Sequence, residues 1–111
     1  MKKEFLFGLA FLILLAASPI SRIRYDEADN LLFIGLRNNL NNDMEDVRVR
    51  VFFPSLGIFL SSGQLDIEKK ESAKKLVYID TNEVPKGEYL VRIIVSNDDF
   101  TDARYRYITV T

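Results

Sequence analysis

Two stretches of this chain place apolar side chains at every second position. Residues 47–53 (VRVRVFF) alternate valine with arginine and end in phenylalanine, and residues 89–96 (YLVRIIVS) bring Tyr89, Val91, Ile93 and Val95 to one face. A two-residue period is that of a β-strand with one buried face. The chain is therefore expected to fold around a sheet that has one side against a core.

Shorter stretches with strand-forming residues occur on both sides of these two, separated by segments rich in Asn, Asp, Gly and Pro. The further predicted strands are residues 20–25, 31–37, 64–67, 76–80 and 103–110. Residues 55–63 predict an irregular crossover or a short edge strand, and residues 38–46 and 68–75 predict loops. Seven or eight strands without a helix after residue 21 predict an all-β, immunoglobulin-like two-sheet sandwich.

The N-terminal segment is a different kind of sequence. Lys2 and Lys3 precede thirteen consecutive apolar residues at 5–17 (FLFGLAFLILLAA), which is the layout of a signal peptide. The uncharged stretch extends to residue 21, the lower length limit for a membrane-spanning helix. A signal peptide and a retained hydrophobic anchor helix are both consistent with it, and a buried core helix is a third alternative.

Neither possible cleavage position fits well. Cleavage after Ala17 places Leu15 where a small residue is preferred, and cleavage after Ser18 places Pro19 directly behind the cut. Residues 1–21 are thus assigned to a signal peptide or anchor, and residues 22–111 to one domain. Either alternative keeps the lysines inside and puts the domain outside the cell, secreted or anchored at the surface.

Composition excludes several kinds of chemistry. The chain has no cysteine and no histidine, which removes disulfides, most zinc sites and the usual nucleophilic triads. Its net charge of −1 gives no reason to expect nucleic-acid binding. No hydrolase, phosphate-binding or metalloprotease motif is present, so the sequence does not predict an enzyme.

Two acidic loops form a candidate calcium site. In an immunoglobulin-like sandwich, the loop at residues 38–46 and the loop at residues 97–102 lie at the same end. Carboxylate and amide oxygens are the ligands that Ca²⁺ prefers. The alternative is that Asn and Asp serve as turn formers. The candidate ligands are Asp43, Asp46, Asp98, Asp99 and Asp102, with Glu45 nearby.

Arginine and tyrosine side chains form a second candidate site. They are expected to share the outer face of one sheet, where they predict either a binding interface or a face kept soluble by charge. The residues are Arg48, Arg50, Arg92, Arg104, Arg106, Tyr105 and Tyr107. A third set, Lys69, Lys70, Lys74 and Lys75, is interleaved with Glu68 and Glu71 and predicts a solvated turn or an anion-facing patch.

Tyr89 follows the turn ending at Gly87 and opens the penultimate strand. This is the position of a tyrosine corner, in which the hydroxyl bonds back to nearby backbone. A plain core tyrosine with its hydroxyl at the rim is the alternative. Tyr89 and Gly87 are therefore candidate structural residues.

Residues 36–58 and 84–110 carry a family resemblance. The first contains D-x-x-D-V-x-V-x-V from Asp43 to Val51, and the second contains G-E-Y-x-V-x-I-x-V-S-N-D from Gly87 to Asp98. This pattern resembles the immunoglobulin-like (CARDB, adhesion-type) repeats of archaeal surface-layer proteins, over most of residues 31–111. The resemblance implies an extracellular structural or adhesive role without enzymatic activity. Surface-layer proteins string several such domains together, so the resemblance does not extend to lattice formation.

The expected function is therefore that of an exported cell-surface domain that contacts a protein, a glycan or a second copy of itself. The membrane is a further partner if the N-terminal segment is retained. The alternative is a small Ca²⁺-binding or ligand-binding accessory module. No other cofactor and no nucleic acid are expected.

Overall fold

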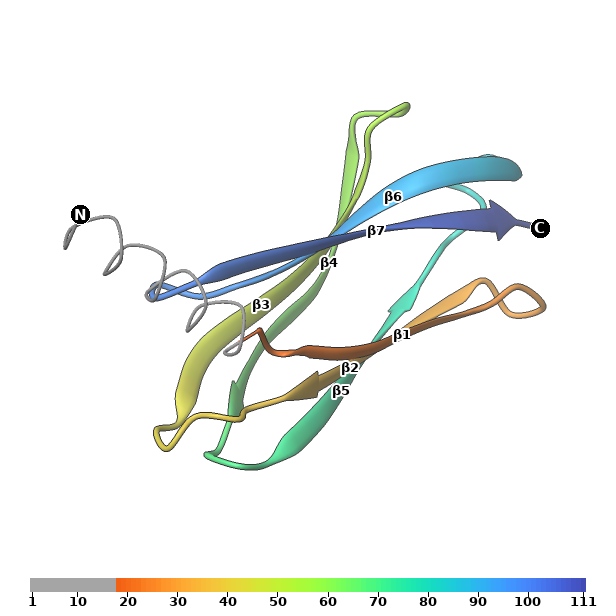
Figure 1. Cartoon of the computed structure of the whole chain (residues 1–111). Coiled ribbons are helices and arrows are strands. Elements are labelled where there is room, and N and C mark those ends of the chain that lie inside the picture. Colours follow the sequence, from red (N-terminus) through yellow and green to blue (C-terminus); the bar gives the residue numbers. More distant parts are fainter. Residues whose placement is uncertain (1–17) are drawn as a thin grey trace, which may run out of the picture.

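The computed structural model describes residues 18–111 (Figure 1). The predicted signal peptide or anchor, with its hydrophobic helix, lies outside the described residues except for its last four positions. The described part is all-β. It consists of seven strands. They are β1 (Ile20–Asp26), β2 (Leu31–Arg37), β3 (Met44–Phe53), β4 (Ile58–Ile67), β5 (Ser72–Tyr78), β6 (Gly87–Ser96) and β7 (Thr101–Val110).

The strands form two antiparallel sheets that pack as a sandwich. One sheet has the order β1-β2-β5 and the other has the order β4-β3-β6-β7. The chain crosses between the layers after β2, after β4 and after β5, so neighbours in sequence are often in different sheets (Figure 1).

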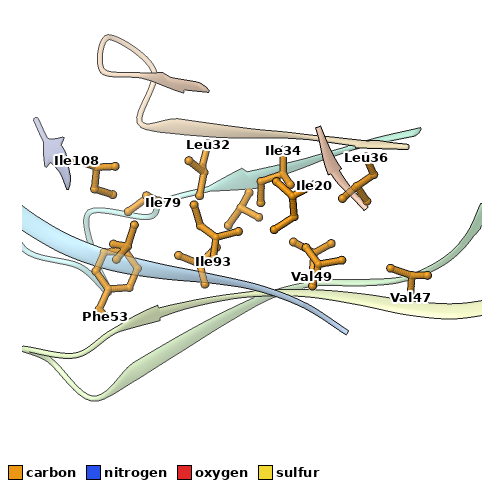
Figure 2. Packing of buried hydrophobic residues seen from close by; sticks show 14 of the residues in the cluster. Ile20, Leu32, Ile34, Leu36, Val47, Val49, Phe53, Ile79, Ile93 and Ile108 are labelled. Atoms are coloured by element: carbon orange, nitrogen blue, oxygen red, sulfur yellow. The ribbon is translucent and has the colours of Figure 1, made fainter. Parts of the chain in front are cut away.

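The core lies between the layers and is built by the alternation seen in the sequence. Leu32, Ile34 and Leu36 of β2 point toward Val49 and Ile93 of the opposite sheet (Figure 2). All five are at most 1% exposed. Burial of an aliphatic side chain stabilises a fold by about 1.5–3 kcal/mol, so this two-residue period fixes which face of each strand is inside.

The third strand begins earlier than predicted. Residues 44–46 were expected to belong to a loop, but β3 starts at Met44, whose side chain is buried. A bulge at residues 45–46 interrupts the pairing with β4, and Asp46 has a φ of 54°. The bulge lets both Met44 and Val47 face inward, which a regular two-residue period forbids.

The segments at 55–63 and 68–75 were also predicted incompletely. Instead of an irregular crossover and a separate short strand, β4 is continuous from Ile58 to Ile67, with a bulge beside Gly63 at a φ of 84°. Residues 72–75 were expected to be a charged turn but belong to β5, where Ala73 packs against the core. Charged residues occupy these strands because both are sheet edges, with one side in water.

The sandwich begins before residue 22. Pro19 is buried, and its carbonyl oxygen accepts a hydrogen bond from the backbone N–H of Arg37 at 2.8 Å. Ile20 and Ser21 already belong to β1, so the boundary expected at residue 21 falls inside this strand.

No helix with the length and apolarity needed to cross a membrane occurs among residues 18–111.

Candidate functional site

The two acidic loops meet at one end of the sandwich. They line a partly open depression whose walls are mostly polar. The residues around it are Asp43, Glu45, Asp46, Asn97, Asp98 and Asp99. Asp102 is not among them: its carboxylate accepts a hydrogen bond from the hydroxyl of Ser18 and lies 3.8 Å from Nη2 of Arg104.

Hydrogen bonds in these loops stabilise one turn and join one loop to its neighbours in space. The carboxamide oxygen of Asn97 accepts from the backbone N–H groups of Asp99 and Phe100 at 2.8 and 3.1 Å. Asp43 accepts from the backbone N–H of Lys69 at 2.9 Å. Within the described chain, no three acidic side chains are grouped closely enough to hold a metal ion. A turn-forming role is thus shown for Asn97, and the calcium site stays a prediction.

The outer face of the β4-β3-β6-β7 sheet carries one continuous row of large side chains. Phe59 pairs with Phe52, Phe52 with Arg92, and Arg92 with Tyr105, so the row crosses all four strands. Strands in a sheet are about 4.8 Å apart, which gives the row a length of roughly 14 Å. We call these four residues the cross-strand row.

Aromatic stacking and cation–aromatic contacts occur within this row and between the row and the adjacent Arg50. The rings of Phe52 and Phe59 stack with centroids 4.4 Å apart, and the Arg50 guanidinium lies 5.6 Å from the centroid of Phe59. Arg92 lies 5.9 Å from the centroid of Tyr105, and its Nε is buried without a hydrogen-bond partner among the described residues. Such contacts contribute about 0.5–1 kcal/mol each at exposed sites and hold the side chains in place.

This face remains largely open to solvent. Phe59 and Tyr105 are each 54% exposed, and Tyr107, which lies opposite Leu90 in the next row, is 74% exposed. Arg48 lies at the other end of the face, where the Gln64 carboxamide, oriented to accept, is 3.0 Å from its Nε. Exposed aromatic and arginine side chains are the ones most enriched at binding hot spots.

Arg104 and Arg106 do not belong to this face, contrary to the prediction. The register of β6 and β7 pairs Arg104 with Ile93 and Arg106 with Val91, both of which point into the core. The two arginines share the inner side of the sheet. They occur there because β7 is an edge strand, from which a long side chain can reach water around the side of the sandwich.

Tyr89 makes the hydrogen bond that defines a tyrosine corner. Its hydroxyl donates to the carbonyl oxygen of Pro85 at 2.6 Å, and its ring packs edge-on against Phe53 at a centroid distance of 5.6 Å. Gly87 has a φ of 154°, and an added Cβ would lie 3.6 Å from the tyrosine hydroxyl. The corner ties the turn before β6 to the core.

The four lysines of the predicted charged turn are divided by the strand boundary. Lys69 and Lys70 lie in the turn before β5, where Lys70 has a φ of 62° and its Nζ donates to the carbonyl oxygen of Asn39 at 2.7 Å. Lys74 and Lys75 lie in β5 on opposite faces. They do not form a single cationic patch.

Two buried asparagines were missed by the sequence analysis. Asn38 is 0% exposed, and Asn30 is 8% exposed. The carboxamide of Asn30 accepts from the Tyr25 hydroxyl at 2.8 Å and from the Thr111 backbone N–H at 3.0 Å. Both residues sit in segments recognised as turns, and a turn assignment does not reveal which asparagine is inside.

Comparison with known proteins identified no relative: no family model matches this chain, and no curated protein matches it.

Proposed function

We propose that this protein is an exported cell-surface protein whose immunoglobulin-like domain has a structural or adhesive, non-catalytic role. The observation that carries the proposal is the open aromatic and arginine face of the β4-β3-β6-β7 sheet. A solvent-exposed row of this kind has no role in the core, whereas it matches the composition of binding surfaces.

The immunoglobulin-like assignment is supported by the strand order and by one local contact. Strands β1, β2 and β5 form one sheet, and β3, β6 and β7 lie together in the other, as the corresponding strands do in immunoglobulin domains. β4 pairs with β3, as an additional strand does in the variable-type arrangement. The bond from Tyr89 to Pro85 adds the tyrosine corner.

Export is supported by the N-terminal sequence, in which Lys2 and Lys3 precede thirteen consecutive apolar residues. Cell fractionation followed by N-terminal sequencing tests it directly. We expect the protein in the envelope or the medium, beginning at Met1 if the anchor is retained and near Ser18 if it is cleaved. Recovery from the cytoplasm with residues 1–17 intact would overturn the export proposal.

Adhesion is tested by retention of purified protein on envelope fragments of its own cells. Replacing Tyr105 and Tyr107 together by serine is expected to weaken retention at least about tenfold, because tyrosine hot spots contribute several kcal/mol to binding. Tyr78→Ser is the matched control, since Tyr78 is 68% exposed on the opposite sheet. Equal retention of all three proteins would show that this face does not bind.

A further inference from the structure

The outer face of the β1-β2-β5 sheet contains a separate hollow. Gly35 of β2 pairs with Arg22 of β1 on one side and with Lys74 of β5 on the other. The middle position of this row has no side chain, so the flanking cations border an open depression whose wall includes Phe33. We call this the Gly35 hollow.

The close approach of β1 leaves little room for a side chain at residue 35. A Cβ at residue 35 would lie 3.2 Å from both the Cβ of Arg22 and the Oγ of Ser21, which is tighter than ordinary van der Waals contact. A register shift between Ile20 and Arg22 lies beside this contact. Because residue 35 is a glycine, backbone and not a side chain lies between the two cations.

The cations around the Gly35 hollow have no anionic partner among residues 18–111. Neither Arg22 nor Lys74 has a carboxylate within 4.0 Å in the described part of the chain, and no acidic residue lines the hollow. The ring centroid of Phe33 lies 6.0 Å from the Lys74 ammonium and 5.3 Å from the Arg24 guanidinium. Two positive charges thus lie over one aromatic ring at the surface, and Arg22 borders the same hollow.

We propose that the Gly35 hollow binds a uronic-acid residue of an acidic polysaccharide. A uronate carries a carboxylate and an apolar ring face on one rigid unit, which matches a cation pair beside an aromatic wall. Charge complementarity excludes a neutral sugar as the preferred ligand, and charge-assisted hydrogen bonds from arginine and lysine supply the recognition.

An acidic peptide fits less well than a uronate. Aspartate and glutamate side chains supply the carboxylate but no apolar ring to lie against Phe33. The acidic loops of a second copy fit less well too, because their one aromatic residue, Phe100, packs against its own core. The choice of a polysaccharide rests on the proposed cell-surface function, because such polymers occur outside the cell membrane.

The test uses the full-length protein in mild detergent, titrated with polygalacturonate oligomers by calorimetry. We expect saturable binding that weakens with added salt. Lys74→Met and Arg22→Gln should each weaken it about tenfold or more, because each removes a hydrogen-bond donor to a charged group. Lys86→Met, which removes the same charge from an exposed loop, should leave it unchanged.

Three outcomes would overturn the proposal. They are absence of binding, equal binding of the methyl-esterified oligomers, and an equal loss in Lys86→Met. Equal competition by polyglutamate would assign the hollow to acidic peptides instead. Thermal unfolding of each variant verifies that it remains folded. A negative binding result would overturn the polysaccharide proposal alone. Export to the cell surface is tested separately by cell fractionation, so the failure of one proposal can be told from the failure of the other.

Discussion

The hydroxyl of Tyr89 donates a hydrogen bond to the carbonyl oxygen of Pro85, four residues earlier, at 2.6 Å. The ring of the same residue packs against Phe53 in the core. A single side chain thereby couples the turn before β6 to the interior.

Tyr89→Phe keeps this ring and removes the hydrogen bond. We expect a loss of about 0.5–1.5 kcal/mol in the free energy of unfolding, the usual net contribution of one intramolecular hydrogen bond. Urea denaturation measures it. Tyr107→Phe is the control, because Tyr107 is 74% exposed, and its substitution should change stability by less than about 0.5 kcal/mol. Equal effects of the two substitutions would contradict a structural role for the corner.

Asn38→Ala should lower the free energy of unfolding more than Tyr89→Phe does. The buried Nδ2 of Asn38 donates to the carbonyl oxygens of Ile67 and Asn42 at 2.9 and 2.7 Å, and its Oδ1 accepts from the backbone N–H of Leu40. Alanine leaves these backbone groups without their partner, which costs about 1–3 kcal/mol for each one that stays buried. Thermal unfolding tests this, with the exposed Asn41→Ala as the control. A loss no larger than that of Asn41→Ala would show that water replaces the carboxamide.

Tyr25 is expected to make the stability of the fold decrease with pH in the alkaline range. Burial, reinforced by the carboxylates of Glu27 and Asp26, raises the pKa of Tyr25 above its ordinary value of 10.0. The folded state therefore keeps this proton at a pH where the unfolded state has lost it. The contribution of Tyr25 to the free energy of unfolding is therefore complete below about pH 10.0, the pKa of an ordinary tyrosine. It is lost as the pH rises through the higher pKa of the folded state.

The comparison of wild type with Tyr25→Phe isolates this effect. The variant should be less stable at neutral pH, because it loses the bond to Asn30, and its stability should decrease less above pH 10.0. Tyr107→Phe, which keeps Tyr25, should retain the full decrease. Denaturation curves at neutral and alkaline pH measure both differences. Parallel pH profiles for wild type and Tyr25→Phe would contradict the assignment.

Gly63→Ala tests the bulge in β4. Gly63 has a φ of 84°, and no atom lies within 4 Å of an added Cβ, so crowding is excluded as a cause of instability. The left-handed conformation costs a residue with a Cβ about 1–2 kcal/mol, and we expect that loss in urea denaturation. Ser55→Ala, in the exposed turn before β4, is the control. A variant as stable as wild type would mean that the bulge relaxes to another conformation.

The sequence predicted the strands whose alternation is unbroken. In β2 and in residues 47–53 every second side chain is buried, in agreement with the two-residue period of a half-buried strand. Prediction was weakest at β4 and β5, the edge strands with polar and charged residues. Their extent depends on pairing with β3 and β2, which a local pattern does not contain.

The candidate interaction face was predicted only in part. Arg48, Arg50, Arg92, Tyr105 and Tyr107 do share a surface, but Phe52 and Phe59 were not expected in it. Arg104 and Arg106 were assigned to the wrong face because charge was taken to mean outward. The strand register decides the face, and it is set by contacts between residues distant in sequence.

The two bulges next to Ser21 and Gly63 have a consequence for assembly. They interrupt β1 and β4, whereas β5 and β7 pair without any register shift. β4 contacts β5, and the Ser18–Asp102 hydrogen bond joins the start of β1 to β7, so each flank of the sandwich has one irregular and one regular edge. A bulge turns a sheet edge away from pairing with another chain, whereas a regular edge offers a template for it. On each flank, strand addition from a second chain is therefore expected at the regular edge, β5 or β7, and is hindered at its bulged neighbour.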